Sequence, residues 1–156
     1  MAQVKMITPC LWFDTQAEEA ATYYCEVFGG DSKIVSVKHY PEEGLADSQK
    51  DFAGKVLTVE FELAGQRFLA LNGGPVFKFS EAISFMVNCA DQNEIDYFWE
   101  KLSHVPESEQ CGWCKDKFGL SWQVTPESLM SELNPNQFAA MMQMKKLDIA
   151  ALKAAA

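Results

Sequence analysis

The chain has 156 residues, of which 48% are hydrophobic and 22% charged, and its formal net charge is −9. This composition is typical of a globular protein, and the length suits one compact domain or two small modules that share a core. The negative charge argues against nucleic acid as a partner, because phosphates are bound mainly by Lys and Arg. No apolar run approaches the roughly 18 residues that a membrane span needs, so we expect no membrane contact.

The first residues and the cysteines indicate a cytoplasmic protein. The beginning of the chain lacks a basic stretch followed by an apolar one, which is the pattern of a secretory signal. Five cysteines are an odd number, which argues against a complete disulfide framework. We expect mostly reduced thiols at Cys10, Cys25, Cys89, Cys111 and Cys114.

The first half of the chain predicts one helix among β-strands. Residues 7–14 form an apolar stretch of strand length, followed by an amphipathic helix. We expect Thr15 and Glu18 to form a capping box at its start, and Gly29 to end it. Three further strands are predicted at 33–40, 56–63 and 67–72.

The second half repeats the order of these signals. A strand-like stretch at 82–89 leads to Asp91 and Glu94, a second candidate capping box, and then to a helix that ends near Leu102. Two further strands are predicted at 110–116 and 120–126.

This duplication predicts an α+β fold of two β-α-β-β-β modules, each with its helix packed on one face of its own sheet. The modules span about residues 5–75 and 80–126, and together with the tail they make the whole chain a single domain. The tail, about residues 127–154, is expected to form helices, because Asn134-Pro135 is a typical helix start.

Five stretches carry a family resemblance that covers nearly the whole chain: ITPCLWFD, AEEAATYY, VLTVEFELAGQRFLALNGGPVFKFSEAISF, CGW with the following KDKFGLSWQ, and QMKKLDIAAL. Together with the duplication, they resemble the PhnB-like family, also labelled 3-demethylubiquinone-9 3-methyltransferase, of the vicinal oxygen chelate superfamily. Glyoxalase I, bleomycin-resistance proteins and extradiol dioxygenases belong to the same superfamily. The methyltransferase label has no support in the residues, because no Gly-rich strand-to-helix turn with a following acidic residue is present.

The resemblance implies curved sheets that enclose a ligand cavity, often completed by a second copy of the chain, so we expect a homodimer. Side chains alternate between the two faces of a strand, and the apolar set should pack against the helices. On this basis Leu69 and Leu71 should face the helix, as should Ile7 and Ile83. The residues expected to line the cavity are Thr8, Trp12, Glu60, Phe68, Ala70, Asn72, Ser84, Met86, Ser121 and Gln123.

The resemblance also implies four positions at which other superfamily members hold a metal with His or Glu. They fall near Thr8, Ala70, Ser84 and Gln123, and none offers an imidazole or a carboxylate. Zinc and iron sites need such donors, so we predict no transition metal and no other cofactor.

Cys111 and Cys114 form a C-x-x-C pair that allows three readings. A redox dithiol would sit at a helix start, and a metal pair would need both thiols on one side. The following KDKFGLSWQ predicts a turn and a strand. We therefore favour two structural cysteines on a strand, pointing to opposite faces.

Two function classes remain open. The first is a non-enzymatic binder of a small organic molecule in a metal-free cavity. The alternative is an enzyme of glyoxalase or dioxygenase type, either metal-dependent or using Glu60 as a general base, which would require a raised carboxyl pKa. Cys10 could be a nucleophile, but we favour a buried small residue there, because no His has a reason to lie beside it.

Overall fold

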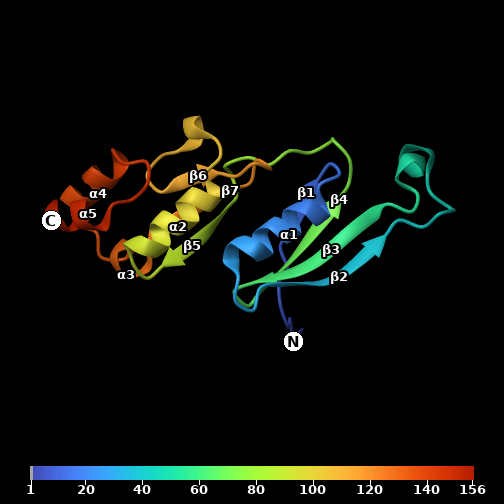
Figure 1. Ribbon diagram of the computed structural model, residues 1–156, viewed down its shortest axis with the longest axis horizontal. Coiled ribbons are helices and arrows are strands. Elements are labelled where there is room, and N and C mark those ends of the chain that lie inside the picture. Colours follow the sequence, from blue (N-terminus) through green and yellow to red (C-terminus); the bar gives the residue numbers. More distant parts are fainter. Residues whose placement is uncertain (1) are drawn as a thin grey trace. The chain divides into compact units, whose positions relative to one another are not determined.

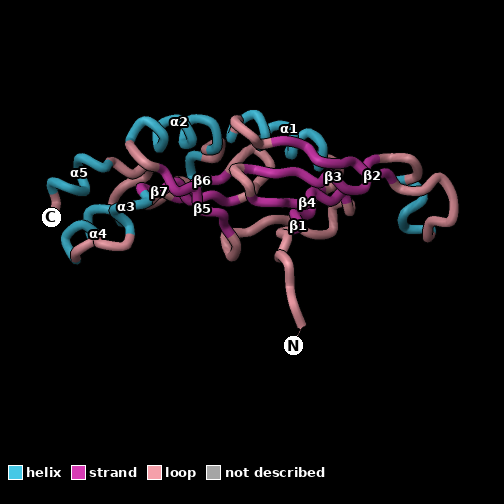
Figure 2. Tube along the Cα trace, turned by 90° about the horizontal axis from the view of Figure 1, so that it is seen from below, coloured by secondary structure: helices cyan, strands magenta, loops and turns pink. Residues whose placement is uncertain are grey.

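The structure is a computed structural model that describes residues 2–156. The chain divides into two compact units, one ending at Lys78 and the other beginning at Phe79. The boundary falls between the two modules that the sequence predicts. Each unit is a small sheet with a helix on one face, as Figures 1 and 2 show.

Unit 1, the part up to Lys78, has the predicted order of one strand, one helix and three strands (Figure 1). In the sheet, the first strand pairs parallel to the fourth, and the remaining neighbours are antiparallel. Its elements are β1 (Cys10–Phe13), α1 (Ala17–Phe28), β2 (Lys33–His39), a 3-10 helix (Asp47–Phe52), β3 (Val56–Leu63) and β4 (Gln66–Asn72), with sheet order β1-β4-β3-β2.

Helix α1 packs on β3 and β4 through small and aromatic side chains. Ala17 and Ala20 are fully buried, and such small residues let the helix come close to the sheet. The ring of Tyr24 stacks on Phe61 with centroids 6.2 Å apart, and Phe61 stacks in turn on Phe68 at 5.4 Å. This aromatic stack is the centre of the unit 1 core.

The start of α1 differs from the prediction. The N-cap residue is Gln16, and in the described chain no side chain next to the helix start caps it, so the expected Thr15–Glu18 capping box is wrong. The side chain of Asn72 takes this role, because its Oδ1 accepts a hydrogen bond from Ala17 N–H at 2.8 Å. A residue at the end of β4 therefore satisfies a helix donor 55 positions earlier in the chain.

Unit 2, which begins at Phe79, has a three-stranded sheet and a helical tail. Its first strand pairs parallel to the central strand, and the edge strand is antiparallel. Its elements are β5 (Ser84–Cys89), α2 (Gln92–Leu102), a 3-10 turn (Pro106–Ser108), β6 (Trp113–Lys115), β7 (Ser121–Pro126), α3 (Glu127–Met130), α4 (Pro135–Met142) and α5 (Ile149–Ala154), with sheet order β5-β7-β6.

The α+β class is confirmed, but the second module has one strand fewer than the first among the described residues. Between α2 and β6 the chain makes only the turn Pro106–Ser108 and an isolated bridge from Gln110 to Trp113. This connection contains Pro106, which cannot donate a backbone hydrogen bond to a strand ladder. The second module therefore reads β-α-β-β.

The predicted helix starts in unit 2 are confirmed. Asp91 Oδ1 accepts from Glu94 N–H at 2.9 Å, which confirms the N-cap, but Glu94 Oε2 accepts from Ala90 N–H at 2.7 Å, one residue before the N-cap, so the reciprocal bond of the predicted capping box is shifted. Asn134 and Gln137 form a complete capping box at α4. The tail closes over a small apolar cluster of its own, which consists of Met141, Leu147 and Leu152.

Candidate functional site

The candidate site lies on the face of each sheet opposite its helix, which we call the open face. In unit 1 the strand registers place on this face Cys10, Trp12, Thr58, Glu60, Glu62, Arg67, Leu69 and Leu71. In unit 2 the corresponding set is Ser84, Met86, Asn88, Trp113, Lys115, Ser121, Gln123 and Thr125.

The predicted orientation of β4 is wrong. Phe68, Ala70 and Asn72 face α1, and Leu69 and Leu71 lie on the open face, the reverse of the expectation. Apolar residues occupy both alternating positions of this strand, so the pattern alone does not choose a face. The antiparallel register decides the face, because it pairs Phe68 with Phe61 in the aromatic stack. These three residues are withdrawn from the candidate site.

Residues before the predicted strands are also placed differently. Thr8 and Ile7 precede β1 and are exposed, and Ile83 precedes β5 and is exposed as well. Trp12 does lie on the open face. Its Nε1–H donates to Gly74 O at 2.9 Å, and its ring meets that of Phe77 edge-on at 5.0 Å.

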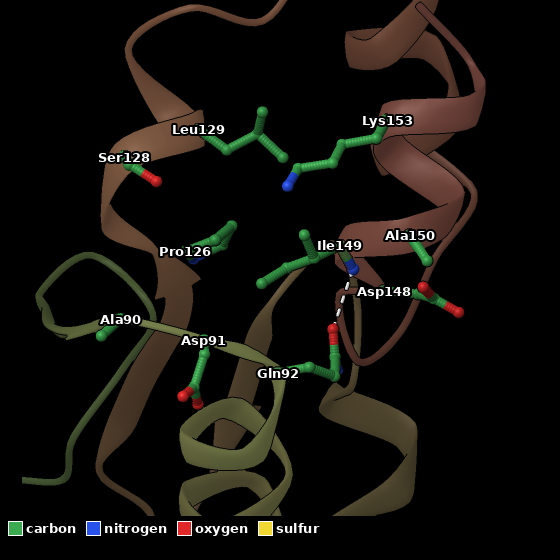
Figure 3. Close-up of a pocket in the computed structure, with 10 residues that line it drawn as sticks. All are labelled: Ala90, Asp91, Gln92, Pro126, Ser128, Leu129, Asp148, Ile149, Ala150 and Lys153. Carbon is green, nitrogen blue, oxygen red and sulfur yellow. Dashed lines mark hydrogen bonds between the residues drawn. The ribbon is translucent and has the colours of Figure 1, made fainter.

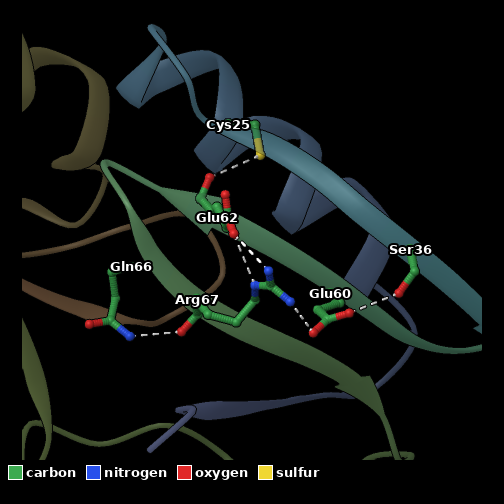
Figure 4. Close-up of polar contacts among 6 residues, drawn as sticks. All are labelled: Cys25, Ser36, Glu60, Glu62, Gln66 and Arg67. Atoms are coloured by element: carbon green, nitrogen blue, oxygen red, sulfur yellow. Dashed lines mark hydrogen bonds and ion pairs between the residues drawn. The ribbon is translucent and has the colours of Figure 1, made fainter. Parts of the chain in front are cut away.

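A charged cluster occupies the open face of unit 1 (Figure 4). Arg67 contacts the carboxylates of Glu60 and Glu62, with Nη2 of Arg67 2.7 Å from Oε1 of Glu62. Ser36 Oγ donates to Glu60 Oε2 at 3.1 Å. The hydrogen bond from Arg67 and then that from Ser36 lower the pKa of Glu60 below its ordinary value. This is the opposite of the raised pKa that the general-base hypothesis needs.

The open face of unit 2 confirms the predicted orientation of β5 and β7. Gln123 lies beside Met86 in the register and reaches across to Ser84, whose Oγ accepts from Gln123 Nε2–H at 2.8 Å. Met86 is exposed, whereas Ser121 is buried on the same face. Four of the predicted residues thus share one face: Ser84, Met86, Ser121 and Gln123.

The C-x-x-C pair is divided between a turn and a strand. Cys114 lies in β6 and is buried opposite Trp122, as the structural reading expects. Cys111 lies instead in the tight turn before β6, with a positive φ of 42°. Its N–H donates to Met144 O at 2.7 Å, so the tail holds the turn.

The thiols lack the properties of redox or nucleophilic cysteines. In the described part of the chain all five cysteines are free. Burial raises the pKa of Cys114 to about 12 and also raises the pKa of Cys111, whereas reactive thiols have a lowered pKa. Cys10 is exposed, which corrects the expectation of burial, and its pKa is also raised by partial desolvation.

Two pockets lie within unit 2. Both are lined in part by loop residues that the sequence analysis did not identify as site residues. The pocket beside the turn before β6 has a volume of about 300 Å³ and is lined by Glu81, Ser108, Gln110, Cys111, Trp113, Cys114 and Ser121. Loop residues at this position carry no periodic signal, so only the structure finds them.

The second pocket, of about 390 Å³, lies between the start of α2 and the tail (Figure 3). The Gln92 amide joins its two sides, since Nε2–H donates to Leu147 O at 3.0 Å and Oε1 accepts from Ile149 N–H at 2.8 Å. Lys153 reaches toward Leu129 and Ile149 across the pocket. None of the open-face residues of β5 and β7 named above lines this pocket.

The donor set does not fit a transition metal. Ala70 has no donor and faces α1, Thr8 lies outside β1, and the amide of Gln123 is engaged with the hydroxyl of Ser84. Over residues 2–156, no three His, Cys, Asp or Glu side chains gather to hold a metal ion. Amide and hydroxyl groups are poor ligands for zinc or iron.

A methyl donor of nucleotide type does not fit either. β1 connects to α1 through Asp14, Thr15 and Gln16, without the glycines that bring a backbone close to a bound nucleotide.

No helix among the described residues has the length and apolar character to cross a bilayer.

Two small sheets, each built around a strand-helix-strand unit, place the chain in a class of two-module α+β proteins. Within this class, the chain belongs to the 3-demethylubiquinone-9 3-methyltransferase family, also called PhnB-like, whose family model matches residues 5–125. It is 34% identical to a PhnB protein from Bacillus cereus, over 78% of this chain and 99% of that chain, with a TM-score of 0.62. A protein from Pseudomonas aeruginosa shares the fold with a TM-score of 0.58 at 18% identity, over 80% of this chain and 98% of that chain. No curated protein matches the sequence.

Proposed function

We propose that the protein binds a small organic molecule on its open faces without a transition metal. The observation that carries this proposal is the hydrogen bond from Gln123 to Ser84. These two residues stand at positions where the superfamily resemblance implies metal ligands. An amide and a hydroxyl can orient a polar ligand group but offer little to a metal ion.

The surroundings of this pair support the same proposal. Trp113 lies beside Gln123 in the register, so an aromatic ring and a neutral hydrogen-bonding group occur together on one face. Most small-molecule sites combine apolar or aromatic lining with a few polar groups in this way. The enzyme alternative based on Glu60 receives no such support, because its carboxylate is already bonded to Arg67 and Ser36.

We also propose a homodimer that works in the cytoplasm. Large apolar side chains are exposed in the segment between β4 and β5, with Val76 72%, Phe77 63% and Ile83 69% exposed, and pairing with a second copy would remove them from water. Free thiols agree with a reducing compartment. Light scattering should give twice the chain mass of 17.5 kDa, and a monomer at micromolar concentration would contradict the dimer.

Elemental analysis and a thermal-shift screen with small aromatic compounds test the binding proposal. We expect substoichiometric Zn, Fe, Ni and Mn, and a rise in melting temperature with at least one compound class in the presence of a chelator. Gln123→Leu should raise the ligand concentration needed for the same stabilisation by roughly tenfold. This factor corresponds to the loss of one net hydrogen bond.

Gln66→Leu is the matched control, because Gln66 is the exposed first residue of β4 and its side chain donates to the carbonyl of Arg67. It should keep the ligand response of the wild-type protein. Stoichiometric metal that is lost on changing Gln123 or Ser84 would overturn the proposal, as would a screen in which no compound stabilises the protein.

A further inference from the structure

Two buried hydroxyl groups on the open face of β7 have no hydrogen-bond partner in the described chain: Ser121 Oγ and Thr125 Oγ1. Both residues are 1% exposed. A buried polar group without a partner destabilises the folded state, so native proteins rarely keep one without a reason. A bound molecule that completes the hydrogen bond is one such reason.

The two hydroxyls differ in their surroundings. Ser121 lines the pocket of about 300 Å³ beside the turn before β6, whereas Thr125, four residues further along the same strand, does not line it. A volume of 300 Å³ is at the small end of ligand sites in proteins. It suits a molecule of about one aromatic ring with a small substituent.

The walls of this pocket are held in place before any ligand arrives. The turn from Gln110 to Trp113 is closed by two backbone hydrogen bonds between these residues, at 3.0 and 2.7 Å. The tail fixes the same turn from outside, because Gly112 N–H donates to Lys145 O at 2.8 Å. A pre-formed wall keeps the cost of ordering low when a ligand binds.

The charges at the pocket cancel. Glu81 lines the pocket and forms an ion pair with Lys115, the neighbour of Ser121 across the β6–β7 ladder. The hydrogen bond from Lys115 lowers the pKa of Glu81, so the carboxylate stays ionised and the pair remains neutral at physiological pH. The pocket therefore has no net charge that would select an ionic ligand. Trp113 contributes an aromatic ring to its lining.

We propose that the Ser121 hydroxyl anchors the hydrogen-bonding group of a small, uncharged aromatic molecule that lies beside Trp113. This inference rests on the proposed function and names its ligand class and its anchoring residue. Phenol carries a hydroxyl on one ring, and toluene has nearly the same shape without the hydroxyl. The pair of probes isolates the hydrogen bond from the apolar contact.

The test is an NMR titration of the full chain with phenol and, separately, toluene, with the wild-type protein, Ser121→Ala and Thr125→Val. In the wild type, phenol should shift the backbone amides of Gln110 to Trp113 and of Ser121. Ser121→Ala should weaken phenol binding by roughly tenfold and leave toluene unchanged. Thr125→Val, which removes the other unpartnered hydroxyl, should leave both probes unchanged.

Folding is checked by urea unfolding, and both variants should equal or exceed the wild type, because each removes an unsatisfied buried group. Ser121→Cys, of similar size, serves as a second variant and should also weaken phenol binding, since a thiol is a poor hydrogen-bond partner.

Equal phenol affinity in wild type and Ser121→Ala, or an equal loss of affinity for both probes, would overturn the inference. If phenol fails to bind while compounds of the wider screen do, this inference alone is lost. A screen without any stabilising compound removes the proposed function as well.

Discussion

The open faces of the two units carry different chemistry on similar sheets. In unit 1, Arg67 lies between two carboxylates, those of Glu60 and Glu62. In unit 2, the amide of Gln123 meets the hydroxyl of Ser84, and both groups are neutral. The helix-facing sides are alike, because both bury apolar strand residues. The fold thus constrains one face of each sheet by packing and leaves the other free to acquire a binding surface.

Each unit also has its own buried polar residue that joins separate segments of that unit. In unit 1 this residue is Asn72, which joins the start of α1 to β3. In unit 2 it is Asp116, a buried carboxylate that accepts from the backbone N–H groups of Phe118 and Leu120 and from the indole N–H of Trp122. The comparison can be tested by removing these groups one at a time.

Asp116→Ala should have the largest effect, a loss of roughly 3–5 kcal/mol in the free energy of unfolding, because three donors lose their acceptor in a buried place. Urea unfolding followed by fluorescence measures it. Asp91→Ala is the control, since this exposed N-cap should cost only about 1 kcal/mol. Equal losses in the two variants would show that Asp116 does not hold unit 2.

Asn72→Ala should cost about 2–3 kcal/mol, because it leaves Ala17 N–H and Val56 C=O without a side-chain partner. The measurement is again urea unfolding. Asn72→Asp keeps an acceptor at the start of α1, where a negative charge is favourable, and should recover part of the loss. A wild-type midpoint for Asn72→Ala would contradict the proposed role of this residue.

Gln123→Leu should reduce stability by only about 0.5–1.5 kcal/mol, the range of one net hydrogen bond. Arg67→Met should lie in the same small range, because partly exposed ion pairs contribute little. Thermal unfolding of both variants tests whether the open faces serve stability or binding. A loss above about 3 kcal/mol in either variant would make its cluster a structural element.

The smallest effect concerns the titration of Glu60, followed by NMR of its carboxyl carbon. Arg67 and Ser36 lower its pKa in the folded chain, so its contribution to stability is present above the unfolded pKa and is lost as pH falls through the folded pKa. Arg67→Met should move the Glu60 pKa upward toward its ordinary value. A pKa above the ordinary value in the wild-type protein would revive the general-base hypothesis.

Side-chain orientation was predictable where polar and apolar residues alternate strictly. In β3 and β7, one alternating set is apolar and the other polar, and the structure follows it. In β4, Phe68 and Leu69 are both apolar, so the alternation gives no direction. The Asp91 cap was predictable because its partner is three residues away, whereas the Asn72 cap joins residues 55 positions apart.

The sequence by itself determined the family, the order of the elements in unit 1, the helix starts of unit 2 and the neutral character of Ser84 and Gln123. These features depend on neighbours within one turn or one strand, where spacing and residue type suffice. Only the tertiary structure decided the face of β4, the turn that holds Cys111 and the burial of the Ser121 hydroxyl beside a pocket that this residue lines. Each of these depends on contacts between segments far apart in the chain, and packing rather than local pattern selects among such contacts.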